Sequence, residues 1–365
     1  MSDEFRTNGG LDHAALVLSG GGITGWFYEL GCMRAWDERM PEGRRIRDFP
    51  LIIGTSAGAV LASMVAGGVA PTDIAEMVRD DAEHPLDFRR EDIYAFHWTK
   101  VLGSLARGAA DLPGLARGYL RTARRASPLD FFTHVQSEAP SGLFSNAPLD
   151  AYLRRFFDAH DIPLKFRDLD RDLRITATDL DRGEPFLFSR ETTPDAEIPH
   201  AAVASSAIPM FFTPVAHEGR DLIDGSIAWS SGIELAIDAG AKLVVVLNPM
   251  VPLRNDRERV CLPAARGACA SIRDLGFSSV GLQAFRVLVH TRLCTDVRRL
   301  REERPDVRIV VLEPTGEEAL ISLASPMAFS TRKEVLTLGY QATRRRLEGV
   351  NGDLEAVVTG ADAEG

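Results

Sequence analysis

The segment Leu51–Gly58 reads LIIGTSAG and decides how the rest of the chain is interpreted. A short apolar run ends at Gly54, and an alanine-rich segment follows Gly58. This pattern predicts a strand, a sharp turn and a helix, with Gly-x-Ser-x-Gly at the turn. In such a turn the serine hydroxyl stands exposed above the sheet, and the helix start points unsatisfied N–H groups towards it. We therefore predict that Ser56 is a nucleophile; the alternative is an ordinary strand-to-helix turn built of small residues.

A similar unit precedes this one. Residues 14–19 predict a buried strand, and Gly20-Gly21-Gly22-Ile23-Thr24-Gly25 leads into a helix with apolar positions at Trp26, Leu30 and Met33. The first seventy residues therefore form a βαβα unit, which is typical of a parallel sheet covered by helices. Later segments predict a hairpin over 173–189, a small-residue helix over 200–208, a strand ending at Asp224 and further strands over 242–249 and 307–312. Long helical regions are expected over 271–303 and 331–348.

The glycine-rich turn supports two interpretations. Gly20-x-Gly22-x-x-Gly25 matches a dinucleotide-binding fingerprint, but that site needs an acidic residue at the end of the second strand, which here ends in Gly54-Thr55-Ser56. Neighbouring parallel strands bring their carboxyl ends together, so the turn is expected beside Ser56. Its N–H groups would then stabilise the oxyanion formed when Ser56 attacks an ester. Loss of one such donor typically costs about 2.7–4 kcal/mol of transition-state stabilisation.

A serine nucleophile needs a base, and the usual partner is a histidine. No histidine stands out: His290 lies in a helical context that favours packing, and His200 and His217 do not follow a strand end convincingly. Asp224 does stand out, because it ends a strand just before Gly225-Ser226. A carboxylate there can act as general base if burial raises its pKa above the ordinary value. The alternative is a plain Asp-Gly turn.

Taken together, these blocks resemble the patatin-like phospholipase family. The resemblance covers about residues 14–247 and rests on four segments in the same order: SGGGITG at 19–25, GTSAG at 54–58, ASSAIPMFFTP at 204–214 and DGS at 224–226, with the hairpin ATDLDRGE at 177–184 in addition. It implies a three-layer α/β/α fold with a mainly parallel central sheet and a Ser–Asp dyad without a catalytic histidine.

In detail, the resemblance implies that Ser56 is the nucleophile, Asp224 its base, and Gly20, Gly21, Gly22 and Gly25 the oxyanion hole. Thr24, Ala57 and Phe211 lie in or beside these segments and are expected to contact substrate. Two positions depart from the family pattern: the family often has Arg where Thr24 stands, and usually Gly or Ala where Ser226 stands.

The function expected is a serine lipid acyl hydrolase, of the phospholipase A or lysophospholipase type, acting through an acyl-enzyme intermediate. Alternatives are an acyltransferase, a carboxylesterase with a Ser–His–Asp triad, and a non-catalytic lipid-binding protein. No cofactor is expected. No acidic cluster resembles a calcium loop, so we expect no calcium requirement and no metal site.

Composition narrows the class of protein. The chain has 365 residues, 45% of them hydrophobic, and a formal net charge of −10, which argues against a nucleic-acid binder. Four scattered cysteines suggest reduced thiols rather than a disulfide framework. The amino terminus has no signal-peptide pattern and no run of eighteen apolar residues exists, so we expect a cytoplasmic protein, peripheral at most at the inner membrane surface.

The organisation expected is one catalytic domain. Its parts are a flexible leader over 1–12, a catalytic core over 13–247 with a helical, basic insertion at about 71–150, a completing segment over 248–350 and a disordered tail over 351–365.

One stretch, residues 98–127, departs from the acidic character of the chain. It holds six basic residues against one acidic residue, a local charge of +5, interleaved with apolar side chains. Such a segment can lie on an anionic membrane surface, the alternative being a solvated helical insertion.

We predict that the protein binds vesicles containing anionic lipid and that added salt weakens this binding, because counterions screen exposed charges. Sedimentation with vesicles at increasing salt measures the effect. Equal binding to neutral vesicles at every salt concentration would contradict it.

Overall fold

The computed structural model describes residues 11–78, 86–93, 95–96, 103, 141–255, 271–314 and 329–348. The predicted leader up to residue 10, the tail over 351–365 and nearly all of the basic stretch over 98–127 lie outside the described residues.

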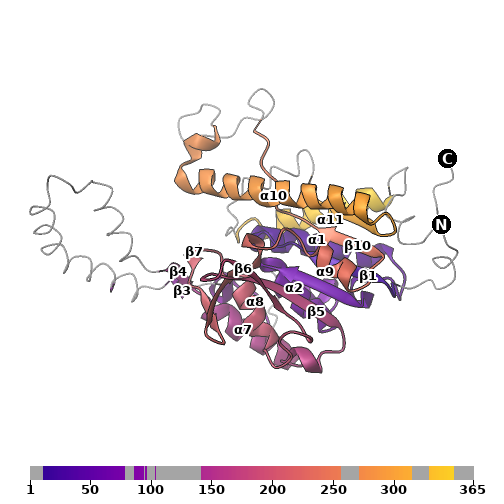
Figure 1. Ribbon diagram of the computed structural model, residues 1–365, viewed down its shortest axis with the longest axis horizontal. Coiled ribbons are helices and arrows are strands. Elements are labelled where there is room, and N and C mark those ends of the chain that lie inside the picture. The colour runs from indigo at the N-terminus through magenta and orange to yellow at the C-terminus, as the bar shows by residue number, and fades with distance from the viewer. Residues whose placement is uncertain are drawn as a thin grey trace, which may run out of the picture.

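A central sheet of mostly parallel strands runs through the molecule (Figure 1). Its strand order is β11-β10-β1-β2-β5-β9-β8, and β6 pairs with β5. The pairs from β11 to β5 are parallel, whereas β6, β8 and β9 add antiparallel pairs beyond β5. The strands are β1 (Ala14–Leu18), β2 (Leu51–Thr55), β5 (Asp172–Asp179), β6 (Glu184–Phe188), β8 (Val215–His217), β9 (Arg220–Asp224), β10 (Leu243–Leu247) and β11 (Arg308–Leu312). The predicted α/β class with a mainly parallel sheet is therefore confirmed.

Helices cover both faces of this sheet. Alternate side chains of a strand point to opposite faces, and in β1 Leu16 and Leu18 join one core while Ala15 and Val17 join another. The first core is shared with α1 (Gly22–Arg39), α2 (Ala57–Ala66), α3 (Pro71–Glu76), α7 (Ala147–Ala159), α8 (Ile198–Ser205) and α11 (Arg332–Glu348). The second core is shared with α9 (Ile233–Asp238) and α10 (Phe277–Glu303). Figure 1 shows the long α10 on one side of the molecule, away from α7 and α8.

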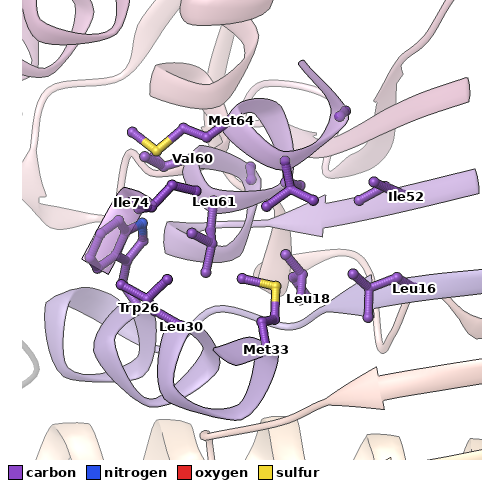
Figure 2. Close-up of a cluster of buried hydrophobic side chains, with 14 of the residues drawn as sticks. Leu16, Leu18, Trp26, Leu30, Met33, Ile52, Val60, Leu61, Met64 and Ile74 are labelled. Atoms are coloured by element: carbon purple, nitrogen blue, oxygen red, sulfur yellow. The ribbon is translucent and has the colours of Figure 1, made fainter. Parts of the chain in front are cut away.

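Apolar side chains of α1 and α2 interlock above β1 and β2 (Figure 2). Leu30 and Met33 of α1 and Leu61 of α2 are fully buried there. Full burial of one such side chain contributes roughly 1.5–3 kcal/mol to stability. This cluster holds the two helices whose first turns follow the glycine-rich turn and Ser56.

Helix α11 packs closely along α1, although more than 290 residues separate them in sequence. Two glycines make the close approach possible. A Cβ at Gly31 would lie 2.1 Å from the carbonyl oxygen of Leu336, and one at Gly339 would lie 2.2 Å from that of Tyr28. The Cys32 thiol donates to the Gly339 carbonyl at 3.5 Å. The C-terminal helix thereby supports the helix that begins at the glycine-rich turn.

Some elements differ from the sequence expectation. Helix α3 ends at Glu76, and α1 continues to Arg39. A second, small sheet was not predicted; it consists of β3 (Ala95–Phe96), β4 (Gly142–Ser145) and β7 (Met210–Phe212) in the order β3-β4-β7. The remaining short elements are α4 (Arg90–Ile93) and 3-10 helices over Ile46–Asp48, Phe166–Asp168, Gly225–Ile227 and Ile272–Leu275.

Within the described ranges, no helix combines the length and the apolar character that crossing a bilayer requires.

We predict that Gly31→Ala lowers the free energy of unfolding by about 1–3 kcal/mol, because the new methyl group would force α1 and α11 apart. Urea denaturation measures this change.

The matched control is Gly281→Ala in α10, where a Cβ meets nothing within 4 Å. This substitution should stabilise the protein by about 0.5–1 kcal/mol, because alanine favours a helix over glycine. Equal effects of the two substitutions would show that the α1–α11 contact is not as tight as described.

Candidate active site

Ser56 lies at the turn between β2 and α2, as the sequence predicts. Its backbone has φ 56° and ψ −133°. Residues other than glycine rarely adopt this combination, which costs about 1–3 kcal/mol. The residue is 5% exposed. Strain of this kind persists only where surrounding contacts hold the backbone in place.

Two serines at the end of α8 supply such contacts. The Ser56 N–H donates to Ser205 Oγ at 2.8 Å, and Ser206 Oγ donates to the Ser56 carbonyl oxygen at 3.0 Å. The peptide groups on both sides of the nucleophile are thus fixed by side chains 149 and 150 residues away. Sequence reasoning placed both serines in a recognised segment but gave no role to either.

The register of β5 brings Asp224 to Ser56. Thr55, the last residue of β2, lies opposite Thr176, and Asp224, the last residue of β9, lies opposite Ala177. Strand β6 pairs with β5 from Ile175 to Asp179, a stretch that overlaps the residues paired with β2 and those paired with β9. Strand β6 therefore takes one edge of β5, and β2 and β9 share the opposite edge. Strand β2 runs parallel to β5 and β9 antiparallel, so their carboxyl ends meet head to head.

The backbone of Asp224 is anchored on both sides. Its N–H donates to the Ala207 carbonyl oxygen at 3.0 Å, and its own carbonyl oxygen accepts from Thr178 Oγ1 at 2.9 Å. A hydrogen bond of 2.7 Å between the hydroxyls of Thr55 and Thr176 joins β2 to β5 just below the turn.

The two carboxyl oxygens of Asp224 have different surroundings. Oδ1 accepts from the Ser226 N–H at 2.9 Å and from Ser226 Oγ at 2.6 Å. Oδ2 is buried and, among the described residues, has no hydrogen-bond partner. The Ser56 hydroxyl is near enough to favour the charged carboxylate, without making a full hydrogen bond to Oδ2. Oδ2 is therefore the atom available to accept a proton from Ser56.

Burial raises the pKa of the Asp224 carboxyl above its ordinary value, and hydrogen bonding from Ser226 and Ser56 opposes this rise. Ser226, one of the two departures from the family pattern, thus has a definite effect: its hydroxyl favours the charged form of Asp224. A higher pKa makes a carboxylate a stronger base, provided that it is still ionised at the working pH.

The glycine-rich turn lies against Ser56. Gly20, Gly21 and Gly22 all have positive φ, at 74°, 132° and 67°. A Cβ at Gly20 would lie 2.4 Å from the Thr55 carbonyl oxygen and 2.9 Å from Ser56 Cβ. Only glycine permits this contact between the two turns.

The four glycines predicted to form an oxyanion hole differ in their N–H groups. The Gly20 N–H donates to Glu29 Oε1 at 2.8 Å, and the Gly25 N–H donates to the Gly21 carbonyl oxygen at 3.1 Å. Within the described part of the chain, no hydrogen bond involves the N–H of Gly21 or of Gly22, at the start of α1. These two N–H groups are available to bind an anion. The N–H groups of Gly20 and Gly25 are already hydrogen-bonded, and these two glycines instead allow the close packing of the turn.

A mainly apolar pocket of about 540 Å³, open mouth included, adjoins Ser56 and Ala57. Its other lining residues come from α1, α2, α7 and the segments around α4 and β7: Gly22, Ile23, Trp26, Val60, Phe88, Ile93, Asn146, Leu149, Ser206, Ile208 and Phe212. Ala57 is one of the three residues that the sequence assigned to substrate contact. The two others do not line this pocket.

Phe211 is half-buried, and the neighbouring Phe212 lines the pocket instead. Successive side chains of a strand point to opposite faces. A prediction that is wrong by one residue therefore names a side chain on the face away from the pocket. Thr24 is buried on the other side of the glycine-rich turn, where it lines a smaller pocket with Arg286 of α10. Burial lowers the pKa of Arg286 to about 10. An arginine thus reaches the neighbourhood of Thr24 from a distant helix, with no local sequence signal.

Among the described histidines, none lines the pocket at Ser56. His290 contacts Glu313 at 3.2 Å, and His217 packs against Phe186 and Phe188. The part of the chain that the structure describes holds no group of three His, Cys, Asp or Glu side chains able to bind a metal ion. Cys32 and Cys294 are free thiols, whereas Cys261 and Cys269 lie outside the described residues.

Comparison with known proteins gives a family match. A family model described as patatin-like phospholipase matches residues 16–237, from β1 to α9. This range contains both turns, Asp224 and the serines of α8.

Similar solved structures include VipD from Legionella pneumophila, with 17% identity over 92% of this chain and 67% of that chain and a TM-score of 0.42. ExoU from Pseudomonas aeruginosa, in complex with SpcU, has 16% identity over 93% and 53% and a TM-score of 0.36. Human GIVD cytosolic phospholipase A2, in complex with methyl gamma-linolenyl fluorophosphonate, has 11% identity over 95% and 60% and a TM-score of 0.40. The chain spans between about half and two thirds of the length of these proteins, and the family assignment rests on the family model.

We predict that Ser226→Ala slows covalent labelling of Ser56 by a fluorophosphonate on the acidic side of the pH profile and does not lower the alkaline plateau. Loss of the Ser226 hydroxyl raises the pKa of Asp224 further, so more of the base is protonated and inactive at low pH. A hydrogen bond to a charged group is worth about 1.5 kcal/mol or more, which corresponds to a roughly tenfold lower rate there. Labelling rates between pH 4 and 9 measure the shift.

The control is Ser230→Ala, which removes a hydroxyl that binds Asp296 rather than Asp224. An unchanged pH profile in Ser226→Ala would rule out this role for Ser226.

Proposed function

The chain belongs to the patatin-like phospholipase family, and on this premise we propose that it is a serine acyl hydrolase that uses a Ser56–Asp224 dyad. Membership of the family implies a hydrolase acting on carboxylic ester bonds of lipids. The finer proposal is cleavage of the phospholipase A or lysophospholipase type through an acyl-enzyme intermediate.

The observation that carries this proposal is the pairing of a strained serine with a buried carboxylate. Asp224 is 1% exposed, and Oδ2 has no hydrogen-bond partner among the described residues. An unsatisfied buried carboxylate oxygen is costly, so it is retained at functional sites rather than for stability. The adjacent turn, in which no described residue binds the N–H groups of Gly21 and Gly22, supports the same chemistry.

The reaction then has two steps. Asp224 Oδ2 takes the Ser56 proton while Oγ attacks the ester carbonyl carbon, and the Gly21 and Gly22 N–H groups stabilise the resulting oxyanion. Collapse of this intermediate breaks the ester bond, and the departing alcohol receives the proton from Asp224. Water next attacks the acyl group on Ser56, again giving its proton to Asp224, and the carboxylic acid is released as Oγ regains a proton.

The pocket supports an acyl chain as the group carried on Ser56. Its walls include Trp26, Val60 and Leu149, which offer an apolar surface next to the nucleophile. Burial of each methylene of a chain contributes about 0.8 kcal/mol.

Three other functions would use the same fold. An acyltransferase would replace water by another alcohol in the second step. A triad-type esterase would require a histidine at Ser56, and among the described residues none lines the pocket. A non-catalytic lipid-binding protein would have no need for a strained Ser56 beside a partly unsatisfied Asp224.

The basic stretch over 98–127 completes the proposal, as a peripheral contact with an anionic membrane that brings the protein to its lipid substrate. Its charge is the support for this contact, and the same stretch underlies the proposed position at the cytoplasmic side of a membrane.

We predict that Ser56→Ala and Asp224→Asn each lower the rate of ester hydrolysis by at least about a thousandfold, since each removes one member of a unit that acts together. Release of fatty acid from mixed phospholipid vesicles measures the rate, and melting temperatures verify the fold.

The matched control is Asp221→Asn, which makes the same change at an exposed position three residues earlier on β9. It should keep full activity. Full activity in Asp224→Asn would exclude the dyad, and loss of activity in His290→Ala or His217→Ala at normal stability would favour the triad. An unlabelled Ser56 after fluorophosphonate treatment would favour the lipid-binding alternative.

A further inference from the structure

A second buried carboxyl group binds the glycine-rich turn. Glu29, in the second turn of α1, has no exposed surface, and among the described residues no other acidic or basic side chain is buried so completely. Neither the nucleophile nor its base uses it. Its burial in an apolar core therefore requires an explanation.

One oxygen of Glu29 holds the turn. Oε1 accepts the N–H of Gly20 at 2.8 Å, immediately before the two glycines whose N–H groups are unoccupied. Oε2 is buried and has no hydrogen-bond partner among the described residues, and no cation contributes to its surroundings. A buried carboxylate with neither a cation nor full hydrogen bonding is strongly disfavoured, so the group keeps its proton.

The geometry points to Glu29 as a positioning residue for the oxyanion-binding turn: in its uncharged form it binds the Gly20 N–H and so fixes the peptides of Gly21 and Gly22 beside Ser56. This inference rests on the proposed function, because it assigns a purpose to the turn in ester cleavage.

Two features of the turn make such an anchor necessary. Strand β1 ends at Leu18, so the Gly20 N–H lies beyond the ladders between β1 and its neighbours and has to be satisfied elsewhere. Gly20 also touches both Thr55 and Ser56, so a shift of this residue would move the turn relative to the nucleophile. A displacement of about 1 Å is enough to lower a rate a hundredfold.

The absence of charge matters as much as the hydrogen bond. A negative charge next to the turn would oppose the oxyanion that the Gly21 and Gly22 N–H groups have to stabilise. A neutral carboxylic acid accepts the Gly20 N–H without adding this repulsion. A glutamine has the same length and also offers one acceptor oxygen without charge, so it should replace Glu29.

The test compares Glu29→Gln with Glu29→Met in the full-length protein. We expect Glu29→Gln to keep kcat for ester hydrolysis within about threefold of wild type. Glu29→Met retains the volume but removes the acceptor, and we expect kcat to fall about a hundredfold with KM changed less than about threefold. The control is Met33→Ala, at a fully buried position one turn further along α1. It should lower the melting temperature and leave kcat unchanged.

Exchange of backbone amide hydrogens in the peptide that contains residues 20–25 tests the inference without any need for activity. Exchange should accelerate in Glu29→Met and remain at the wild-type rate in Glu29→Gln and Met33→Ala. If wild type cleaves no ester, the proposed function fails, while exchange still decides whether Glu29 holds the turn. Wild-type exchange or wild-type kcat in Glu29→Met would overturn the inference, as would equal losses in Glu29→Gln and Glu29→Met.

The pH dependence of stability reports the charge of Glu29. Burial raises its pKa well above the ordinary 4.5, so the folded chain keeps a proton that the unfolded chain loses. Stability from this group is complete below pH 4.5 and is lost as the pH rises towards the folded pKa. Cys32, whose thiol Glu29 influences, has its pKa raised to about 12, chiefly by burial, and stays protonated over this range.

Wild type should therefore lose melting temperature relative to Glu29→Gln between pH 5 and pH 8. A constant difference between the two proteins over this range would overturn the assignment of an uncharged Glu29.

Discussion

Strand β5 makes ladders with three other strands, and two of these ladders share one of its edges. Where β2 ends, opposite Thr176, β9 ends from the other direction, opposite Ala177. Because the two strand ends meet head to head, neither strand can continue further along β5. The polypeptide therefore has to turn away from the sheet at the end of each strand. One turn carries Ser56 and the other carries Asp224. Their proximity thus depends on backbone hydrogen bonds, which are much less variable than contacts between side chains.

The other residues of the site are arranged around the point where β2 and β9 end. The positive φ of Ser56 strains the turn, and Ser205 and Ser206 hold it from α8. The glycine-rich turn approaches from β1, the neighbouring parallel strand, and lies against Thr55. Two buried carboxyl groups, Asp224 and Glu29, stand on either side of this arrangement, and each has one oxygen without a partner among the described residues. Burial disfavours charge at both, but one must ionise to act as base and the other is suited to stay neutral.

Sequence reasoning was most successful where a local pattern determines the structure. The turns at Gly20–Gly25 and Ser56 combine an apolar strand, small residues and a helix within a few positions, and β9 ends in an Asp-Gly turn. Contacts between distant segments were not predictable in this way. Nothing near Ser205 signals that its hydroxyl binds a backbone N–H 149 residues earlier, and nothing near Arg286 signals that it lies beside Thr24. Phe211 and Phe212 differ only in the face of β7 on which they lie, and two adjacent phenylalanines carry no information about that choice.

The packing of α11 against α1 has a consequence for the order in which the protein is made. Synthesis runs from the amino terminus, so β1 and α1 leave the ribosome before β10 and α11, with one edge of β1 still unpaired and one side of α1 still uncovered. Until those segments emerge, the glycine-rich turn rests on an unfinished support, and an apolar strand edge and helix face stay exposed to the cell. A growing chain of this kind presents the surfaces that chaperones bind, and the centre around Ser56 can mature only after β10 and α11 have been translated.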